Sequence, residues 1–396
     1  MDNRLIAVPP LPRHELRKEG LEWFVADENE GYLCDDFVQI TRAELDNFRA
    51  ASAELFGLAM EAAQRIVDRK AWEDAGIPEN AVSLIAYSLQ HEKDNYLVGR
   101  FDFAGGIDRT PLKMLEINAD TCSLMPETAF IQELYWELES KQLKYRPFNL
   151  LLHGLTQKLK KLLQQNPDKA ANLLVTTFGY EEDVLNMRVI EEAARAAGFT
   201  QVKHSTLEEV IFSAEEGIFM QAKTGEYTRY DFWYKFTPWD IIAYDEPELW
   251  DILEQIIRNR LCVVMNPAFS MLLQSKAIMK FMYDIAPRHA HLLKTTFKAD
   301  DFYHYKYVRK PIFGRMGENI SFFNGAKKAV YKTKGDFGDQ ETVFQELADF
   351  NEDIEEYRYQ PSIYWTGEAC ALCFRRQDDL IIDDDAEFVG HIISTE

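Results

Sequence analysis

The chain has 396 residues, of which 46% are hydrophobic and 28% charged, an ordinary globular composition that predicts a large core divided among two or three lobes. Its formal net charge of −22 disfavours nucleic acid and anionic lipid as partners and favours a cationic substrate such as an amine or polyamine, although solubility alone also explains it. The sequence has neither an apolar run of the roughly 18 residues that span a membrane nor a signal-like start, so we expect a cytoplasmic protein that binds no membrane.

The first predicted elements in chain order are a long helix, two short strands and two more helices. Thr41 and Glu44 form a T-x-x-E capping box, and apolar residues at helical spacing follow it, which predicts a core helix over residues 41–68. The stretch "RFDFAGGIDRTPLKMLEINAD", residues 100–120, predicts two strands joined by a turn. Helices are then predicted over residues 126–143 and 149–166.

The next segment, from about residue 150 to 265, has the pattern of an α/β lobe of its own. A buried strand at 171–180, an amphipathic helix at 181–199 that Gly198 ends, and a strand at 201–210 form a βαβ unit. In the sequence, this lobe therefore lies between the elements predicted before residue 150 and those predicted after residue 265.

The rest of the chain predicts a hairpin, one more helix and several strands. The hairpin turns at Thr224 and Gly225, and a short strand follows it at 261–267. A helix is predicted over 270–285. Antiparallel-looking strands are predicted at 305–314, 319–323, 326–333 and 368–376.

The five cysteines are scattered and odd in number, which favours reduced thiols over a disulfide framework. Cys370 and Cys373 have the C-x-x-C spacing, but they lie in an apolar, strand-like run without a second C-x-x-C or a pair of histidines. A zinc site is therefore disfavoured.

Four polar side chains occupy the two short strands at 100–120. Because alternate side chains of a strand share a face, Arg100 lies with Asp102 and Glu116 with Asn118, and a hairpin places all four on one side. Burying two carboxylates beside a single arginine is costly, whereas Mg²⁺ takes carboxylate and amide oxygens as ligands. The alternative is an arginine–carboxylate ladder on an exposed sheet.

A second polar group follows in "RKPIFGRMGENISFF", residues 309–323. Lys310 ends a strand, and the turn with Gly314 and Gly317 allows backbone N–H groups to approach an anion; the alternative is an ordinary hairpin. Lys276 and Arg375 are further cations, with a solvated ammonium and a turn arginine paired to Asp378 as their alternatives. The chain has no GxxxxGK[ST], GxGxxG, HExxH or GxSxG motif, which excludes the commonest nucleotide, zinc-protease and serine-hydrolase sites.

The order and spacing of several segments resemble the glutathionylspermidine synthase family, in particular its stand-alone synthetase-like members, over residues 14 to 394. The segments are "RFDF", "LEINADTCS", "FWYKFTPWDIIAYDEP", "LLQSKAIM", "RKPIFGRMGENIS", "VFQEL" and "CALCFRRQDDLII". The resemblance implies a mixed α+β and α/β chain with the ATP-grasp fold, in which two antiparallel sheets clamp ATP.

The E-x-N segment precedes the lysines here, so the resemblance implies a permuted order of the ATP-grasp parts. Residues 1–148 form the first part with the metal-binding hairpin. Residues 149–266 form an inserted pre-ATP-grasp-like α/β lobe, and residues 267–396 form the second part with the phosphate-binding lysines and the glycine turn. The family's bifunctional members carry an additional Cys/His amidase domain, and we do not expect that hydrolytic activity from this sequence.

The activity that the resemblance implies is a carbon–nitrogen ligase that depends on ATP and Mg²⁺. It forms an amide through an acyl phosphate, between a peptide-like carboxylate such as glutathione and an amine such as spermidine. The alternatives are a catalytically silent nucleotide-binding homologue and a phosphotransferase that uses the same cleft.

The family motifs also imply a role for individual residues of this chain. The implied Mg²⁺ ligands are Asp102, Glu116 and Asn118, and the implied ATP contacts are Lys276, Lys310, Gly314, Gly317, Asn319 and Gln345. Arg100 and Arg375 would stabilise the transferred phosphoryl group, and Thr121, Ser123 and Arg315 would contact the acid substrate. Glu181 and Glu182, which follow the first strand of the lobe, are expected to attract the amine; ordinary solvated acids are the alternative.

Overall fold

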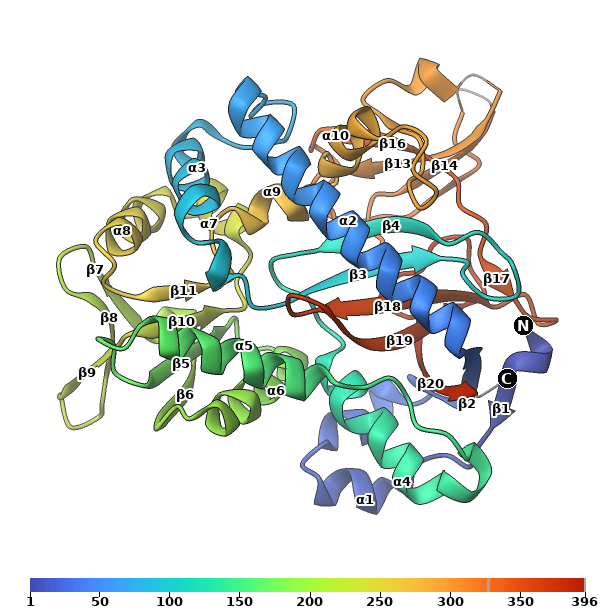
Figure 1. Cartoon of the computed structure of the whole chain (residues 1–396), viewed down its shortest axis with the longest axis horizontal. Helices are drawn as coiled ribbons and strands as arrows, with labels where there is room; N and C mark the ends of the chain where they lie inside the picture. The colour runs from blue at the N-terminus through green and yellow to red at the C-terminus, as the bar shows by residue number, and fades with distance from the viewer. Residues whose placement is uncertain (303, 326–327, 395–396) are drawn as a thin grey trace.

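The computed structural model describes residues 1–302, 304–325 and 328–394, and these form a mixed α/β chain with four sheets. The largest sheet has eight strands in the order β1-β2-β20-β19-β18-β3-β4, with β17 paired to β18. It contains the first and last strands of the chain, so the two termini lie at the same end of the molecule (Figure 1). The strands are β1 (Leu5–Ala7), β2 (Leu33–Thr41), β3 (Gly99–Ala104), β4 (Lys113–Asn118), β17 (Asn351–Glu352), β18 (Arg358–Trp365), β19 (Ala369–Gln377) and β20 (Glu387–Ser394).

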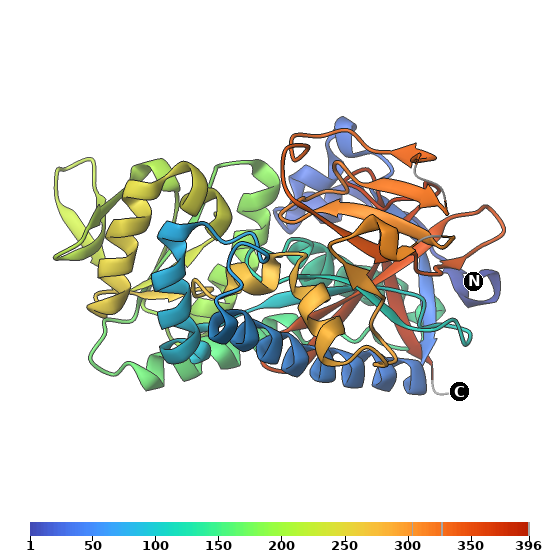
Figure 2. The ribbon, with the colours of Figure 1, turned by 90° about the horizontal axis from the view of Figure 1, so that it is seen from above.

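The long helix α2 (Arg42–Arg69) lies along one face of this sheet (Figure 2). Its predicted capping box is confirmed, because the Thr41 hydroxyl accepts from the Glu44 N–H at 3.2 Å and Glu44 accepts from the Thr41 N–H at 2.7 Å. Leu45, Phe48 and Leu55 are fully buried on the helix face that packs on the sheet. The smaller helices of this half are α1 (Arg13–Lys18), α3 (Val82–His91) and α4 (Gln132–Leu143).

Strands β3 and β4 pair as the antiparallel hairpin that the sequence predicts. Arg100 lies opposite Asn118, and Asp102 lies opposite Glu116. The alternation of side chains along each strand then puts these four polar groups on one face, while Phe101 packs on the opposite side in the core.

The α/β lobe extends from the end of the molecule opposite the termini (Figure 1). Its parallel sheet has the order β11-β10-β5-β6, and Gly198 ends its main helix with a φ of 107°. The predicted βαβ unit is confirmed. The elements are α5 (Leu151–Gln165), β5 (Asn172–Thr177), α6 (Glu181–Ala197), β6 (Gln201–Thr206), β10 (Phe232–Lys235), α7 (Trp239–Asp245), α8 (Pro247–Arg258) and β11 (Val263–Met265).

A three-stranded antiparallel sheet flanks the lobe and contains the predicted hairpin. Its strands are β7 (Val210–Ser213), β8 (Gly217–Gln221) and β9 (Tyr227–Tyr230), and Gly225 turns the hairpin with a φ of 89°. The strand predicted over 201–210 is thus too long, because it ends at Thr206 and a new strand begins at Val210.

A five-stranded sheet with the order β12-β16-β13-β14-β15 forms the remaining part of the chain. Its strands are β12 (Thr295–Thr296), β13 (Lys306–Pro311), β14 (Ser321–Asn324), β15 (Tyr331–Lys332) and β16 (Thr342–Glu346). The strand predicted over 326–333 is shorter than expected, and its first two residues, 326 and 327, lie outside the described part of the chain.

Two predicted helices differ from the structure. The helix expected over 270–285 is two short helices, α9 (Ser270–Gln274) and α10 (Ile278–Ile285), because the Lys276 N–H bonds the Ile312 carbonyl and the Ser275 hydroxyl bonds the Ala75 carbonyl. The interpretation of Lys276 as a helical residue was therefore wrong. The helix expected over 126–143 begins with a π-helical turn, Glu127–Ile131, before α4.

All five cysteines lie in the described part of the chain, and their thiols are free and buried. No helix in those same ranges combines the length and the apolar character that crossing a membrane requires.

Candidate active site

A pocket with about 760 Å³ of empty space, open mouth included, lies between the eight-stranded and the five-stranded sheets. One wall is formed by Leu115 and Glu116 in the middle of β4, the other by β13 and the end of β16, and the turn after β13 closes one side. The polar residues and glycines that line it include Glu116, Lys276, Lys310, Gly314, Arg315, Gly317 and Gln345.

Glu116 and two lysines converge in this pocket. The Lys276 ammonium lies 3.0 Å from a Glu116 carboxylate oxygen and donates to the Gly314 carbonyl at 2.6 Å. The Lys310 ammonium donates to Gln345 Oε1 at 2.8 Å and to the Leu115 carbonyl at 3.2 Å. The Glu116 carboxylate thus has two cations beside it, and the pocket lining also includes Arg315, Glu318 and Glu346.

The pKa values of these groups follow from burial and from one another. Burial raises the pKa of Glu116, but Lys276 and Lys310 outweigh that effect and hold it well below its ordinary value. Burial lowers the pKa of Lys310 to about 8, and the nearby Glu116 carboxylate limits the drop. Lys310 is thus mostly charged at neutral pH and is sensitive to any loss of the Glu116 charge.

The polar face of the β3–β4 hairpin is already internally paired. Arg100 donates to both oxygens of Asp102, at 2.8 and 2.9 Å, and to the Ser123 carbonyl at 2.8 Å. Asn118 and Ser362 each donate to Asp102 at 2.8 Å. Arg100 is 5% exposed and Asp102 is 2% exposed.

This pairing corrects one step of the sequence argument. A metal is not needed to compensate the two carboxylates, because Arg100 neutralises Asp102 and Lys276 neutralises Glu116. The two side chains nevertheless gather with Asn118 on neighbouring strands, and carboxylate and amide oxygens are the ligands that Mg²⁺ takes. The donor set fits a magnesium ion if Asp102 and Glu116 exchange part of their present contacts for it. The described residues contain no cluster of three or more His, Cys, Asp or Glu with the geometry of a metal site.

The turn after β13 contains residues with positive φ. Gly317 has a φ of 69°, and a Cβ atom there would lie 2.8 Å from the Cβ of Asp383, so a larger residue does not fit. Asn319 also has a positive φ, 54°, and its Oδ1 accepts from the Phe337 N–H at 2.8 Å. Gln345 is 1% exposed and ends beside Lys310.

The remaining predicted residues lie outside the lining of this pocket. Arg375 donates to the Asp383 carbonyl, and its buried Nε has no partner among the described residues. Burial raises the pKa of Glu182, which lies in the electrostatic field of Arg375, Asp384 and Arg100. The residues outside the pocket lining are Arg100, Asp102, Asn118, Asn319, Thr121, Ser123, Glu181, Glu182 and Arg375.

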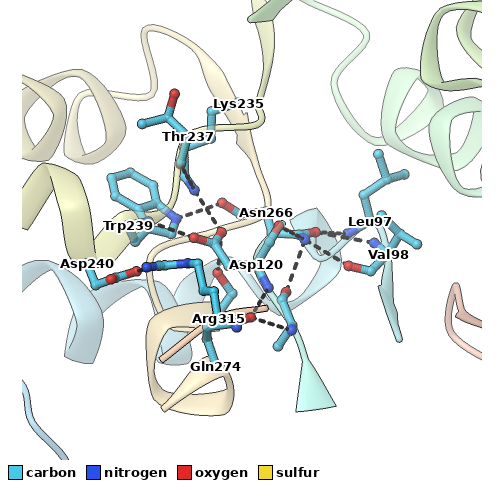
Figure 3. Close-up of polar contacts among 12 residues, drawn as sticks. Leu97, Val98, Asp120, Lys235, Thr237, Trp239, Asp240, Asn266, Gln274 and Arg315 are labelled. Carbon is cyan, nitrogen blue, oxygen red and sulfur yellow. Dashed lines mark hydrogen bonds and ion pairs between the residues drawn. The ribbon is translucent and has the colours of Figure 1, made fainter. Parts of the chain in front are cut away.

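Sequence reasoning missed a buried ion pair next to the pocket. Lys235 and Asp120 are 2.7 Å apart, and their side chains are 0% and 1% exposed (Figure 3). The Trp239 N–H and the Ser270 hydroxyl also donate to Asp120. A lysine inside the apolar strand "FWYKF" is the signal that would have found it, because a buried ammonium needs a buried partner.

Asn266 joins the same region to the start of β3. Its amide nitrogen donates to the carbonyls of Val98, Ala119 and Asp120, and its oxygen accepts from the N–H groups of Leu97 and Val98 (Figure 3). The segment after β4 is therefore held rigidly between the β3–β4 hairpin and the α/β lobe.

The fold is similar to that of a glutathione synthetase-like protein of known structure. Over 98% of this chain and 100% of the other, the structure matches the apo form of a glutathione synthetase-like effector from Globodera pallida, with a TM-score of 0.55 and 9% sequence identity. The chain belongs to the glutathionylspermidine synthase preATP-grasp family, whose model matches residues 4–394.

Several curated relatives carry names from ligase chemistry. A Haemophilus influenzae protein named "Putative acid--amine ligase" is 24% identical over 388 residues, which cover 95% of each chain. The bifunctional glutathionylspermidine synthetase/amidase of Escherichia coli is 24% identical over 337 residues, 80% of this chain and 52% of that protein. The trypanothione synthetase of Crithidia fasciculata is 25% identical over 325 residues, 75% and 47% of the two chains. The aligned part thus spans about half the length of the latter two proteins.

Proposed function

We propose that this protein is an ATP- and magnesium-dependent carbon–nitrogen ligase that joins a peptide-like carboxylate to an amine. The observation that carries the proposal is the convergence of Lys276, Lys310 and Glu116 in one pocket between two sheets. Phosphoryl transfer asks a protein mainly for positioning and positive charge, and the two lysines place positive charge in this pocket of an acidic chain. The names of the family and of the relatives support the same chemistry.

In the proposed complex, the ATP phosphates lie against the two lysines under the Gly314–Asn319 turn. The adenine lies toward Gln345, where the pocket is lined by the apolar side chains of Val308, Leu347 and Ile381. Asp102, Glu116 and Asn118 hold Mg²⁺, which neutralises phosphate charge when it is bound. Arg100 and Arg375 stabilise the transferred phosphoryl group.

The reaction has two steps in which bonds and charges balance. A carboxylate oxygen of the acid attacks the γ-phosphorus of ATP, and ADP leaves with the electrons of the broken P–O bond. The amine nitrogen then attacks the carbonyl carbon of the acyl phosphate, inorganic phosphate leaves, and the nitrogen loses a proton. The products are an amide, ADP and phosphate.

The proposed substrates follow from the family name and from charge. Glutathione and spermidine are the first acid and amine to test, because the Escherichia coli relative is named for their product. Thr121, Ser123 and Arg315 contact the acid in this proposal. Glu181 and Glu182 attract the amine, whose cationic form also suits the net charge of −22.

The test is phosphate release from MgATP with a panel of peptides and polyamines, alone and in pairs. A ligase releases phosphate only when an acid and an amine are both present, and the Lys310→Ala variant releases none. Hydroxylamine in place of the amine traps the acyl phosphate as a hydroxamate. Phosphate transfer without a hydroxamate supports a phosphotransferase instead, and nucleotide binding without turnover across the panel supports a silent homologue.

A further inference from the structure

The α/β lobe contributes two charged side chains to ion pairs with residues outside the lobe. Lys235 comes from the end of β10, and Asp240 from the first turn of α7 (Figure 3). Lys235 pairs with Asp120, which follows β4, and Asp240 pairs with Arg315, which lies in the turn after β13. One cation and one anion of the lobe thus bind two other segments of the chain, and Arg315 is the partner that lines the pocket.

The Asp240–Arg315 pair connects the lobe to the turn that carries the proposed phosphate contacts. Arg315 Nη2 donates to Asp240 Oδ1 at 2.5 Å, and Arg315 lines the pocket between Gly314 and Gly317. The Arg315 side chain is 22% exposed, whereas that of Asp240 is 7% exposed. The Arg315 guanidinium therefore contacts the lobe through Nη2, and the Arg315 side chain also forms part of the pocket wall.

The energetics favour a permanent pair over a contact that opens when an anion arrives. Burial raises the pKa of Asp240, and Arg315 opposes that rise, so the carboxylate depends on Arg315 for its charge. The other nearby cation is Lys235. Its ammonium already donates to Asp120 at 2.7 Å and to the Thr237 carbonyl at 2.9 Å, so it does not replace Arg315 as the partner of Asp240. Withdrawing Arg315 would leave a buried carboxylate without a partner, which is strongly unfavourable.

We propose that Asp240 is a positioning residue for nucleotide binding, which acts through Arg315 to fix the Gly314–Asn319 turn against the α/β lobe. This inference rests on the proposed function of the pocket and extends it to a residue of the inserted lobe. Arg315 keeps its place at the phosphate end because Asp240 holds Nη2, while the rest of the guanidinium remains available to an anion in the pocket.

The first test is a double-mutant cycle on the affinity for the magnesium complex of a non-hydrolysable ATP analogue, measured by calorimetry. Asp240→Asn keeps the side-chain size and removes the charge, and we expect its Kd to rise about tenfold. Because Asp240 acts through Arg315, the double variant with Arg315→Gln should bind no more weakly than Arg315→Gln alone. Asp245→Asn, an exposed change at the end of the same helix, should leave Kd unchanged.

Two results of this cycle would overturn the proposal. One is an Asp240→Asn protein that binds the analogue as tightly as the parent protein. The other is a double variant whose loss is the product of the two single losses, which would mean that Asp240 and Arg315 act independently.

The second test needs no nucleotide and therefore separates this inference from the proposed function. Amide hydrogen exchange of residues 314–319 should become about tenfold faster in Asp240→Asn and stay unchanged in Asp245→Asn. If the parent protein binds no nucleotide, the proposed function fails while the exchange result still decides the positioning role. If Asp240→Asn does not fold, Arg315→Gln removes the same pair from its more exposed end, and unchanged exchange of the turn in that variant would overturn the proposal.

Discussion

The carboxyl group of Glu127 allows a quantitative prediction next to the candidate site. Glu127 is 1% exposed at the start of the π-helical turn; Tyr32 donates to its Oε1 at 2.6 Å, and Oε2 has no partner among the described residues. Burial raises its pKa from 4.5 to about 7, Glu182 adds to the rise, and Tyr32 and Arg100 oppose it.

The sign of the resulting pH dependence follows from which state binds the extra proton. Between pH 4.5 and about 7, Glu127 is protonated in the folded protein and ionised in the unfolded chain, so the folded state loses stability as the pH rises through this window. The shift corresponds to about 3 kcal/mol, fully lost above the folded pKa. For a chain of this length that is roughly 4 °C in Tm.

The perturbation is Glu127→Gln, because an amide keeps the acceptor for Tyr32 and never ionises. The quantity to compare is the Tm of the variant minus the Tm of the parent protein. We expect this difference to be roughly 4 °C larger at pH 8 than at pH 4.5. Any cost of the unpartnered amide nitrogen is the same at both pH values and cancels. Glu137→Gln, an exposed change on the following helix, is the matched control. A Glu127→Gln difference that does not change with pH in scanning calorimetry would refute the reasoning.

Three further predictions concern the buried pairs and the pocket. Lys235→Met should lower the free energy of unfolding by about 3–5 kcal/mol, because it leaves the buried Asp120 carboxylate without its cationic partner. A loss below about 1 kcal/mol in urea titrations would contradict this. Lys310→Ala should abolish the rise in Tm that the ATP analogue causes, and an undiminished rise would place the nucleotide elsewhere. Removing magnesium with EDTA should stop phosphate release and adding magnesium back should restore it, whereas full activity in EDTA would exclude the proposed metal role.

The parts of the fold that the sequence predicted are those set by local patterns. The capping box at Thr41 and Glu44 and the left-handed cap at Gly198 each depend on a few neighbouring residues, and the structure has both. The shared face of the four polar side chains on β3 and β4 was also predictable, because alternate side chains of a strand point to the same face.

The parts that the sequence did not predict depend on partners far along the chain. The break between α9 and α10 is caused by hydrogen bonds from residues 275 and 276 to Ala75 and Ile312, which no local pattern reveals. Lys235 and Asp120 are 115 positions apart. The same limit explains why a metal seemed necessary for the hairpin carboxylates, since Lys276 reaches Glu116 from a distant segment.

The transfer of carboxylate oxygen to phosphate tests the central claim most directly. With an acid labelled with ¹⁸O in its carboxylate, MgATP and the amine that together release phosphate, we expect each phosphate to carry one ¹⁸O atom by mass spectrometry. The Lys310→Ala variant should yield no labelled phosphate. Phosphate free of ¹⁸O in the parent protein would contradict an acyl phosphate intermediate and, with it, the proposed ligase mechanism.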